Sequence, residues 1–367
     1  MIWTLPAKTT MDKRTKPWQL GFMPMNGSHN RRGMSAKCYR VIRKVSLLTI
    51  AWCLTWLSLA KNAETRVINV AVSARSLAQV AHYVAEEKGY YRDEGVEVRL
   101  ILMSTPIAAR ALIAGNAEFT GVSGGVLPAI VTGARLRFVF SAFYRPMFWL
   151  YSRPDIRDVT GLKGKRVAVS GLGSGPATLL LEHLKKRGIE GGRDLTILSM
   201  GITPNRFAAL VNGSVDAAVL IPPFTFMAEE GGFRELVSFI KEDFVELQGS
   251  IILREELLKA EPLLVEKFIR ATLKGFRYAR ENRAETIPIL ARNVRTTHEL
   301  AAKDYDAGRP AMTLDGTVNE KLQRAYLEMG LRRMEVKDGP SPEKVFDFFL
   351  TKKVLSELDL KKWRPAP

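Results

Sequence analysis

The stretch Leu162–Gly188 reads LKGKRVAVSGLGSGPATLLLEHLKKRG, and the order of its parts decides the fold. An apolar run that suits a buried strand, KRVAVS, breaks into a loop with three glycines, and Pro176 then opens a helical segment. Proline favours the first turn of a helix, and the free N–H groups of that turn can bind an anionic or polar group. The stretch therefore predicts a strand, a helix and, between them, a loop that faces a ligand.

The same order of strand, loop and helix recurs before and after this stretch. VINVAV (Val67–Val72) precedes a helical segment that ends at Gly89, and VEVRLIL (Val96–Leu102) precedes one that begins at Thr105-Pro106. Strands that alternate with helices predict an α/β fold with two mixed, mostly parallel sheets and flanking helices. The other expected strands are AEFTGVS, LRFVF, MFWLYS, KRVAVS, DLTILSM, VDAAVLI and SIIL.

After Leu253 the sequence changes to helical spacing. PLLVEKFIRATLKGFRYARE (Pro262–Glu281) places large apolar residues about one turn apart, which predicts a long amphipathic helix. Further helices are expected at Arg283–Arg292, His298–Ala307, Val318–Met329 and Pro342–Phe349.

The charge of the chain is concentrated at its start. Of the 367 residues, 46% are hydrophobic and 25% charged, which is ordinary for a globular protein, and the formal net charge is +17. Residues 1–63 hold 11 Lys and Arg residues and one acid, Asp12, which leaves +7 for the rest of the chain. Because no basic run is interleaved with aromatic residues, we expect no nucleic-acid partner.

The segment after Met34 has the layout of a secretory signal peptide. A basic stretch leads into VSLLTIAWCLTWLSLA (Val45–Ala60), and small residues follow that suit cleavage. We expect a signal peptide over 34–63 and a periplasmic protein, with an uncleaved anchor as the alternative. A lipid anchor at Cys53 is not expected, because Trp52 precedes it. Residues 1–33 are interpreted as a disordered extension, or else Met34 is the true start.

Both cysteines, Cys38 and Cys53, lie in this leader. A mature chain without cysteine has no disulfide, no thiolate nucleophile and no Cys-ligated metal. His82, His183 and His298 show no second ligand at metal-binding spacing. We therefore expect neither a metal nor a cofactor.

Two glycine-rich stretches of the sequence partly match known motifs for nucleotide binding or hydrolysis. The loop Gly171–Gly175 fails G-x-G-x-x-G, because Pro176 takes the place of the third glycine, and it lacks the Gly-Lys of a Walker A loop. Gly121–Gly125 reads G-V-S-G-G and matches the nucleophile elbow, with Asp216 and His298 following in hydrolase order. Too few strands precede Ser123 for that fold, so we expect a cleft-lining serine and no enzyme, and keep a hydrolase as an alternative.

Four blocks of sequence resemble a known family. They are AVSARSLAQVAHYVAEEKGYYRDEGVEVRL, ALIAGNAEFTGVSGGVLPAIVTGARLRFV, LKGKRVAVSGLGSGPATLLLEHLKKRG and ALVNGSVDAAVLIPP. Together they resemble the solute-binding proteins of ABC transporters, in the branch for nitrate, sulfonates, taurine and thiamine-pyrimidine precursors. The resemblance runs from about Val67 to Ala291.

The resemblance implies a two-lobed, type II-like periplasmic binding fold with a ligand cleft between the lobes. Lobe one would comprise 67–151 plus 248–350, and lobe two 152–247. The hinge would be two crossings near Met147–Arg153 and Leu247–Leu253. Carried over by position, the ligand-binding residues are Ser73, Arg75, Ser76, Leu77, Ser104, Thr105, Ser123, Gly124, Ser170, Gly171, Gly173, Ser174, Gly175, Pro222 and Phe224.

The function implied is capture of a small organic or anionic ligand by hinge closure, and its delivery to an ABC permease in the inner membrane by a monomeric receptor. Arg75 suits an acidic ligand, because guanidinium groups bind carboxylates and sulfonates. The alternative is an enzyme on the same fold, of the thiamine-pyrimidine or menaquinone-pathway type. The former carries a cysteine-rich motif that the mature chain lacks, and the latter is usually cytoplasmic.

Overall fold

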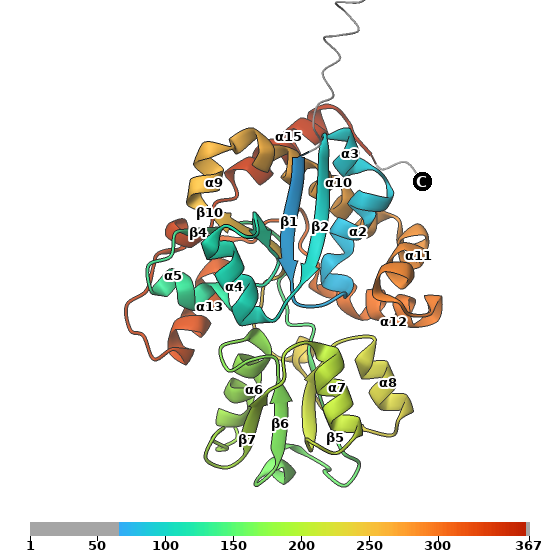
Figure 1. Cartoon of the computed structure of the whole chain (residues 1–367), viewed down its shortest axis with the longest axis vertical. Helices are drawn as coiled ribbons and strands as arrows, with labels where there is room; N and C mark the ends of the chain where they lie inside the picture. Colours follow the sequence, from blue (N-terminus) through green and yellow to red (C-terminus); the bar gives the residue numbers. More distant parts are fainter. Residues whose placement is uncertain (1–65, 365–367) are drawn as a thin grey trace, which may run out of the picture. The chain divides into compact units, whose positions relative to one another are not determined.

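The computed structural model describes residues 66–364, and these form two separate five-stranded sheets (Figure 1). The first has the strand order β2-β1-β3-β10-β4, and the second β7-β6-β8-β5-β9. The strands of the first are β1 (Arg66–Val72), β2 (Val96–Leu102), β3 (Phe119–Thr120), β4 (Leu136–Phe143) and β10 (Gln248–Arg254). Those of the second are β5 (Trp149–Ser152), β6 (Arg166–Val169), β7 (Thr196–Ser199), β8 (Ala217–Leu220) and β9 (Arg234–Ser238).

The two sheets share one pairing pattern. In the first, β1 runs parallel to β2 and β3, and β10 runs antiparallel to β3 and β4. In the second, β6 runs parallel to β7 and β8, and β5 runs antiparallel to β8 and β9. The predicted α/β class with two mixed sheets is confirmed, although parallel pairings do not outnumber antiparallel ones.

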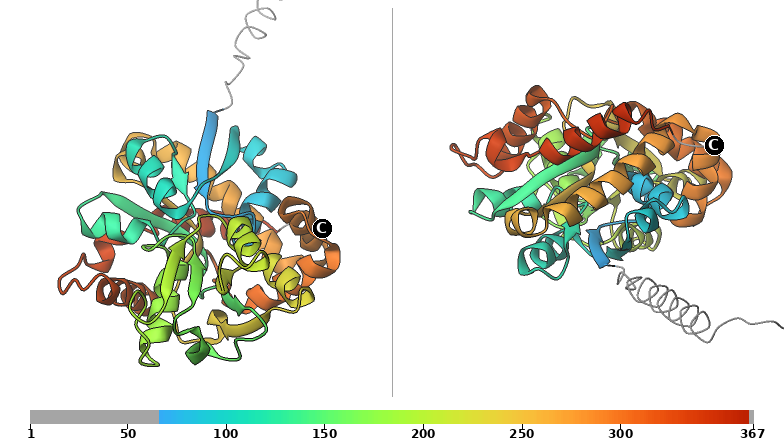
Figure 2. Two further views of the ribbon diagram at one scale, coloured as in Figure 1. Left: turned by 60° about the horizontal axis from the view of Figure 1, so that its bottom comes forward. Right: turned by 90° about the horizontal axis from the view of Figure 1, so that it is seen from above.

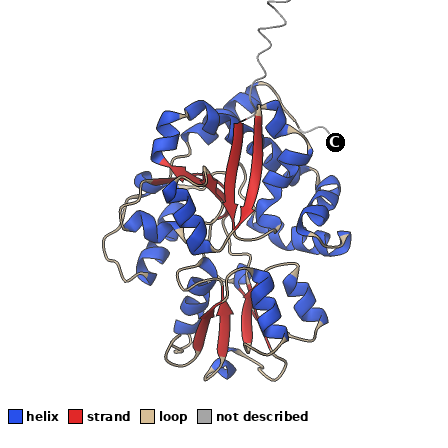
Figure 3. Cartoon of the chain, viewed as in Figure 1, coloured by secondary structure: helices blue, strands red, loops and turns tan. Residues whose placement is uncertain are grey.

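Helices pack against the strands of both sheets (Figure 3). The helices that follow strands of the first sheet are η1 (Leu77–Gln79), α2 (Val80–Glu87), α3 (Tyr90–Asp93), α4 (Thr105–Ala114) and α5 (Val126–Val131). The second sheet carries η2 (Val159–Leu162), α6 (Gly175–Lys185), α7 (Thr203–Val211), α8 (Phe224–Glu230) and η3 (Phe239–Lys241). After β10 come α9 (Glu255–Ala260), α10 (Pro262–Glu281), α11 (Arg283–Val294), α12 (His298–Gly308), η4 (Arg309–Ala311), α13 (Glu320–Arg333), α14 (Pro342–Val345) and α15 (Phe349–Leu360).

Both faces of the second sheet are buried. Successive side chains of a strand point to opposite faces, and neighbouring residues here belong to two different apolar clusters. Leu150, Val167 and Val219 pack in one apolar cluster, whereas Tyr151 and Ala218 belong to another. Near-continuous apolar runs such as RVAV and AAVL are typical of strands covered on two sides.

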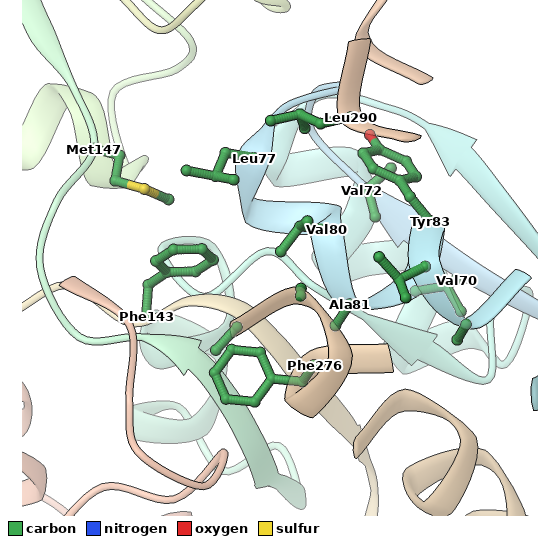
Figure 4. Close-up of a cluster of buried hydrophobic side chains, with 14 of the residues drawn as sticks. Val70, Val72, Leu77, Val80, Ala81, Tyr83, Phe143, Met147, Phe276 and Leu290 are labelled. Carbon is green, nitrogen blue, oxygen red and sulfur yellow. The ribbon is translucent and has the colours of Figure 1, made fainter. Parts of the chain in front are cut away.

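The largest apolar cluster packs the first sheet against α2 and α10 and extends to Tyr151 and Ala218 of the second sheet. Leu77, Val80, Phe143, Met147 and Phe276 are all buried in it, and Leu77 and Met147 point toward one another (Figure 4). Leu77 and Met147 also line the cleft described below, so this part of the cleft wall is fixed by packing in the core.

The structure differs from the sequence prediction in the crossings between the sheets. Trp149–Ser152 lies in the predicted strand MFWLYS, but the resemblance assigned it to a crossing, whereas it pairs with β8 and β9 inside the second sheet. The second crossing was placed at Leu247–Leu253, where β10 instead pairs within the first sheet. The segments that join the sheets are 144–148 and 239–247, and the strands beside them, β5 and β10, each pair on both sides within a sheet.

Two further elements differ from the prediction. One helix was expected at Pro342–Phe349, but α14 ends at Val345, and Phe346 forms an isolated bridge with Phe138 of β4. The chain then forms α15, which packs against α10 and β4, so the helical part continues beyond residue 350 (Figure 2). Strand β9 was not expected, because RELVS has little apolar alternation.

The proposed leader and both cysteines lie outside the described residues. Within 66–364, no helix combines the length and apolar character needed to cross a membrane.

Candidate ligand-binding site

The loops at the ends of strands from both sheets surround one cleft of about 70 Å³. In α/β sheets, ligands bind where such loops meet at the carboxyl ends of parallel strands. Most of the residues that line it from the first sheet and its helices are Ser73, Ala74, Ser76, Leu77, Ala78, Gln79, Ser104, Thr105, Gly121, Val122, Ser123, Gly124 and Asp304, and Gln248 and Gly249 of β10 join them. The rest, from the second sheet and the joining segments, are Met147, Phe148, Ser170, Gly175, Pro176, Gly201, Ile202, Thr203, Arg206, Ile221, Pro222 and Glu246.

Ten of the fifteen residues carried over from the resemblance line this cleft. They are Ser73, Ser76, Leu77, Ser104, Thr105, Ser123, Gly124, Ser170, Gly175 and Pro222. The structure therefore brings these ten together from five loops, and their role in binding remains a prediction.

The other five lie elsewhere. Arg75 is exposed, and Phe224 is half-buried at the start of α8, where its ring lies 5.5 Å from that of Phe207. Gly171 is buried and Gly173 exposed, both outside the cleft lining. Ser174 is fully buried, and its hydroxyl donates to the Gly171 carbonyl at 2.6 Å.

The Ser174 hydroxyl also accepts a hydrogen bond from the N–H of Ala177 at 3.4 Å, so it caps α6. The Glu246 carboxylate lies next to the start of this helix. A Cβ built on Gly175, the first residue of α6, would lie only 2.6 Å from Glu246 Oε1. A carboxylate is stabilised at a helix N-terminus. The glycine loop therefore has one of the chain's own carboxylates beside it, where the sequence suggested the anionic end of a ligand.

Ser123, which follows β3 of the first sheet, forms hydrogen bonds to the joining segment 239–247. Its hydroxyl is buried, donates to the Leu247 carbonyl and lies 3.2 Å from Glu246 Oε1. The adjacent Gly124 meets the backbone of α6, because a Cβ built there would lie only 2.4 Å from the Gly175 nitrogen. Glycine at this position allows loops from the two sheets to touch.

Arg206 is a buried cation on the second-sheet side of the cleft. Its guanidinium donates to the carbonyls of Val219, at 2.8 Å, and Gly201, and to the Thr203 hydroxyl at 2.8 Å. Burial lowers the pKa of Arg206 to about 9, so the group remains charged at neutral pH. Its hydrogen bonds hold the segment after β7 against strand β8.

Asp304 of α12 is a further buried charged residue of the cleft that sequence reasoning missed, in addition to Arg206 and Glu246. Its side chain is 6% exposed, and burial raises its pKa to about 7. It lies on the inward stripe of the helix with Ala301, Tyr305 and Gly308, which are all buried. An acid on the apolar stripe of an amphipathic helix is the sequence signal that could have revealed it.

Two fully enclosed polar atoms at the cleft have no hydrogen-bond partner among the described residues. They are Oε1 of Gln79 and Oγ of Ser170. Both residues line the cleft, one from each sheet. Buried polar groups are usually paired, so these atoms are placed to meet a ligand or water.

The residues of the hydrolase alternative do not form a triad. The Ser123 hydroxyl is used as described, and Asp216 accepts hydrogen bonds from Arg166 at 2.9 and 3.1 Å. His298 is exposed at the start of α12 and lies outside the cleft lining. Among residues 66–364, no group of three or more His, Cys, Asp or Glu side chains could hold a metal ion.

The model of the NMT1/THI5-like family matches residues 78–286, which is more than half of the chain. The chain belongs to the NMT1/THI5-like family. Its match with the riboflavin-binding protein RibY of Chloroflexus aurantiacus is 27% identical over 226 residues. That match covers 59% of this chain and 64% of the relative's length.

Solved structures share the fold at lower identity. The alkanesulfonate-binding protein SsuA from Xanthomonas axonopodis, bound to MOPS, matches with a TM-score of 0.64 and 19% identity, over 77% of this chain and 99% of its own. The desulfurization enzyme DSZB matches with a TM-score of 0.59 and 15% identity, over 79% of this chain and 99% of its own. One fold therefore serves both binding proteins and an enzyme.

Proposed function

We propose that the chain is an extracytoplasmic solute-binding receptor that closes on a small organic ligand and delivers it to an ABC importer. The first lobe would carry the first sheet and the second lobe the second sheet, with segments 144–148 and 239–247 as the hinge. A leader over 34–63 would direct the chain to the periplasm, where the receptor would work as a monomer. The observation that carries the proposal is a cleft lined by loops of both sheets, which brings together ten of the residues predicted to bind the ligand.

The mechanism is stabilisation of the closed state by a ligand that bridges the lobes. Ser73, Ser104 and Thr105 contact the cleft from the first sheet, and Ser170 and Thr203 from the second. A ligand that contacts both sets is bound more tightly in the closed state than in the open one, and this difference drives closure.

The similar proteins suggest two ligand classes to test, a flavin and sulfonates. The experiment is thermal melting of the purified chain with riboflavin, MOPS, taurine, nitrate and benzoate, followed by mass spectrometry of the recovered compound. A ligand at 100 times its Kd should add about 2.7 kcal/mol of stability, which raises Tm by roughly 5–10 °C. Recovery of an altered compound would show an enzyme, and a Tm that no ligand of any class moves would refute the receptor.

A further inference from the structure

We infer that the ligand presents a nitrogen-bearing hydrogen-bond donor, such as an amine, an amidine or a heterocyclic N–H, to Asp304 and Gln79, with no acidic group at that end. This inference rests on the proposed function, because it names the ligand class of the same cleft. It follows from the hydrogen-bonding groups that the cleft leaves free and from the charges in its wall.

The first observation is a carboxyl group without a partner. Asp304 is 6% exposed and lines the cleft, yet no hydrogen bond or ion pair joins it to another described residue, although its charge acts on the nearby Tyr83 hydroxyl. An ionised carboxylate only accepts hydrogen bonds, and burying one unpaired is costly. A ligand that supplies the missing donor recovers that cost, so the site selects for a donor.

The second observation is a neighbouring acceptor. Gln79 is 4% exposed, and its Oε1 has no hydrogen-bond partner among the described residues. The short helix that ends at Gln79 packs closely on the helix of Asp304, because a Cβ on Gly308 would lie 2.3 Å from Leu77 Cδ2. Two free acceptors on adjacent elements match a group that carries more than one N–H.

The third observation is that no cation in the lining is free for an anion. The charged residues there are Arg206, Glu246 and Asp304, and the Arg206 guanidinium already donates to three oxygens of its own chain. Arg75, which the sequence offered for an acidic ligand, is exposed and outside the lining. An organic anion would therefore meet two carboxyl groups and no unpaired cation.

The size of the cleft favours a small compound. A cleft of about 70 Å³ is well below the roughly 300 Å³ at which clefts for drug-sized ligands begin. A neighbouring cavity of about 320 Å³ shares Gly124, Gly175 and Glu246 with the cleft, so a flavin would have to extend into that cavity or separate the lobes. An amine or amidine of a few atoms fits the cleft itself with less opening.

The test compares compounds that share a carbon skeleton and differ in the head group. Benzamidine, benzoate and benzenesulfonate form one series, and butylamine, butyrate and butanesulfonate form another. Each is titrated into the full chain at pH 8, with Tm and calorimetry as readouts. We expect benzamidine or butylamine to bind and the four anions not to bind.

Three variants locate the binding. Asp304→Asn should weaken binding of the nitrogen compound about 10- to 100-fold, as expected for a lost hydrogen bond to a charged group. Gln79→Met, which keeps the side-chain length and removes Oε1, should also weaken it. Asp306→Asn is the matched control, because Asp306 is exposed on the same helix and pairs with Arg283 away from the cleft. Tm without ligand shows that each variant is folded.

Two results would overturn the inference in different ways. Binding of an anion, or of a nitrogen compound equally well to Asp304→Asn and wild type, would refute the ligand class and leave the receptor standing. If neither series binds, and riboflavin and MOPS also leave Tm unchanged, the receptor function fails together with the inference.

Discussion

Gly124→Ala should hold the two sheets apart without unfolding either. Gly124 does not have the positive φ that would restrict the position to glycine, so alanine fits its backbone. The added Cβ would lie 2.4 Å from the Gly175 nitrogen, 3.1 Å from the Gly175 Cα and 3.3 Å from the Ser174 carbonyl carbon. All three atoms belong to the backbone at the start of α6, so no side chain can rotate away.

The size of the effect follows from these distances. Ordinary contact begins near 3.4 Å, so the loop and α6 must separate by about 1 Å. Overpacking of this kind costs about 1–3 kcal/mol. If the lobes hinge, the cost falls on closure, and ligand affinity drops roughly 5- to 150-fold while the unliganded chain keeps its Tm.

Small-angle X-ray scattering of the unliganded chain tests this prediction, because it needs no ligand. Gly124→Ala should increase the radius of gyration, whereas the control Gly173→Ala should not, since nothing lies within 4 Å of a Cβ at Gly173. An unchanged radius together with a drop in Tm of several degrees would show that the contact belongs to a rigid core, and would refute the reasoning.

Three further predictions concern buried groups. Because burial raises the pKa of Asp304 from 3.8 to about 7, the folded state binds the proton more tightly, and wild type loses stability as pH rises from about 4 to 7. The stability advantage of Asp304→Asn in urea unfolding should therefore grow by at most about 3 kcal/mol between pH 5 and 8, and no growth would contradict an unpaired carboxyl. Arg206→Met should lower the free energy of unfolding by at least about 2 kcal/mol, because it leaves buried carbonyls unpaired; a smaller loss in the same assay would show that water replaces the guanidinium. Gly275→Ala should lower Tm, because its Cβ would lie 2.2 Å from the Ala81 carbonyl where α10 crosses α2; an unchanged melting curve would show that these helices can separate.

The sequence was sufficient for the sheets but not for the crossings between them. Runs such as VINVAV and VDAAVLI predicted strands correctly, because apolar strands covered by helices have a strong local pattern. Which sheet Trp149–Ser152 joins depends on a pairing with Arg234–Ser238, a strand whose polar sequence gives no local signal. Pairing between distant strands therefore determines which sheet contains Trp149–Ser152, and the local sequence pattern does not reveal it.

The loop residues of the cleft could be predicted from the sequence, whereas its charged residues Glu246 and Asp304 could not. Ser170 directly follows β6, and Ser123 and Gly124 come soon after β3, so position alone placed them at the sheet ends. Glu246 and Asp304 reach the cleft from a joining segment and from a helix that are distant in the sequence. Their burial depends on tertiary packing, which is why the residues that set the cleft's charge were missed.

The position of β10 has a consequence for the order in which the chain can fold. β10 lies between β3 and β4, yet it is separated from them in sequence by the whole second sheet. During synthesis, residues 149–238 can complete their own sheet while β3 and β4 still lack the strand that joins them. The N-terminal half of the first sheet must therefore wait for about a hundred residues to be made, and a chain shortened before Gln248 leaves two strand edges unpaired in a protein that must avoid aggregation.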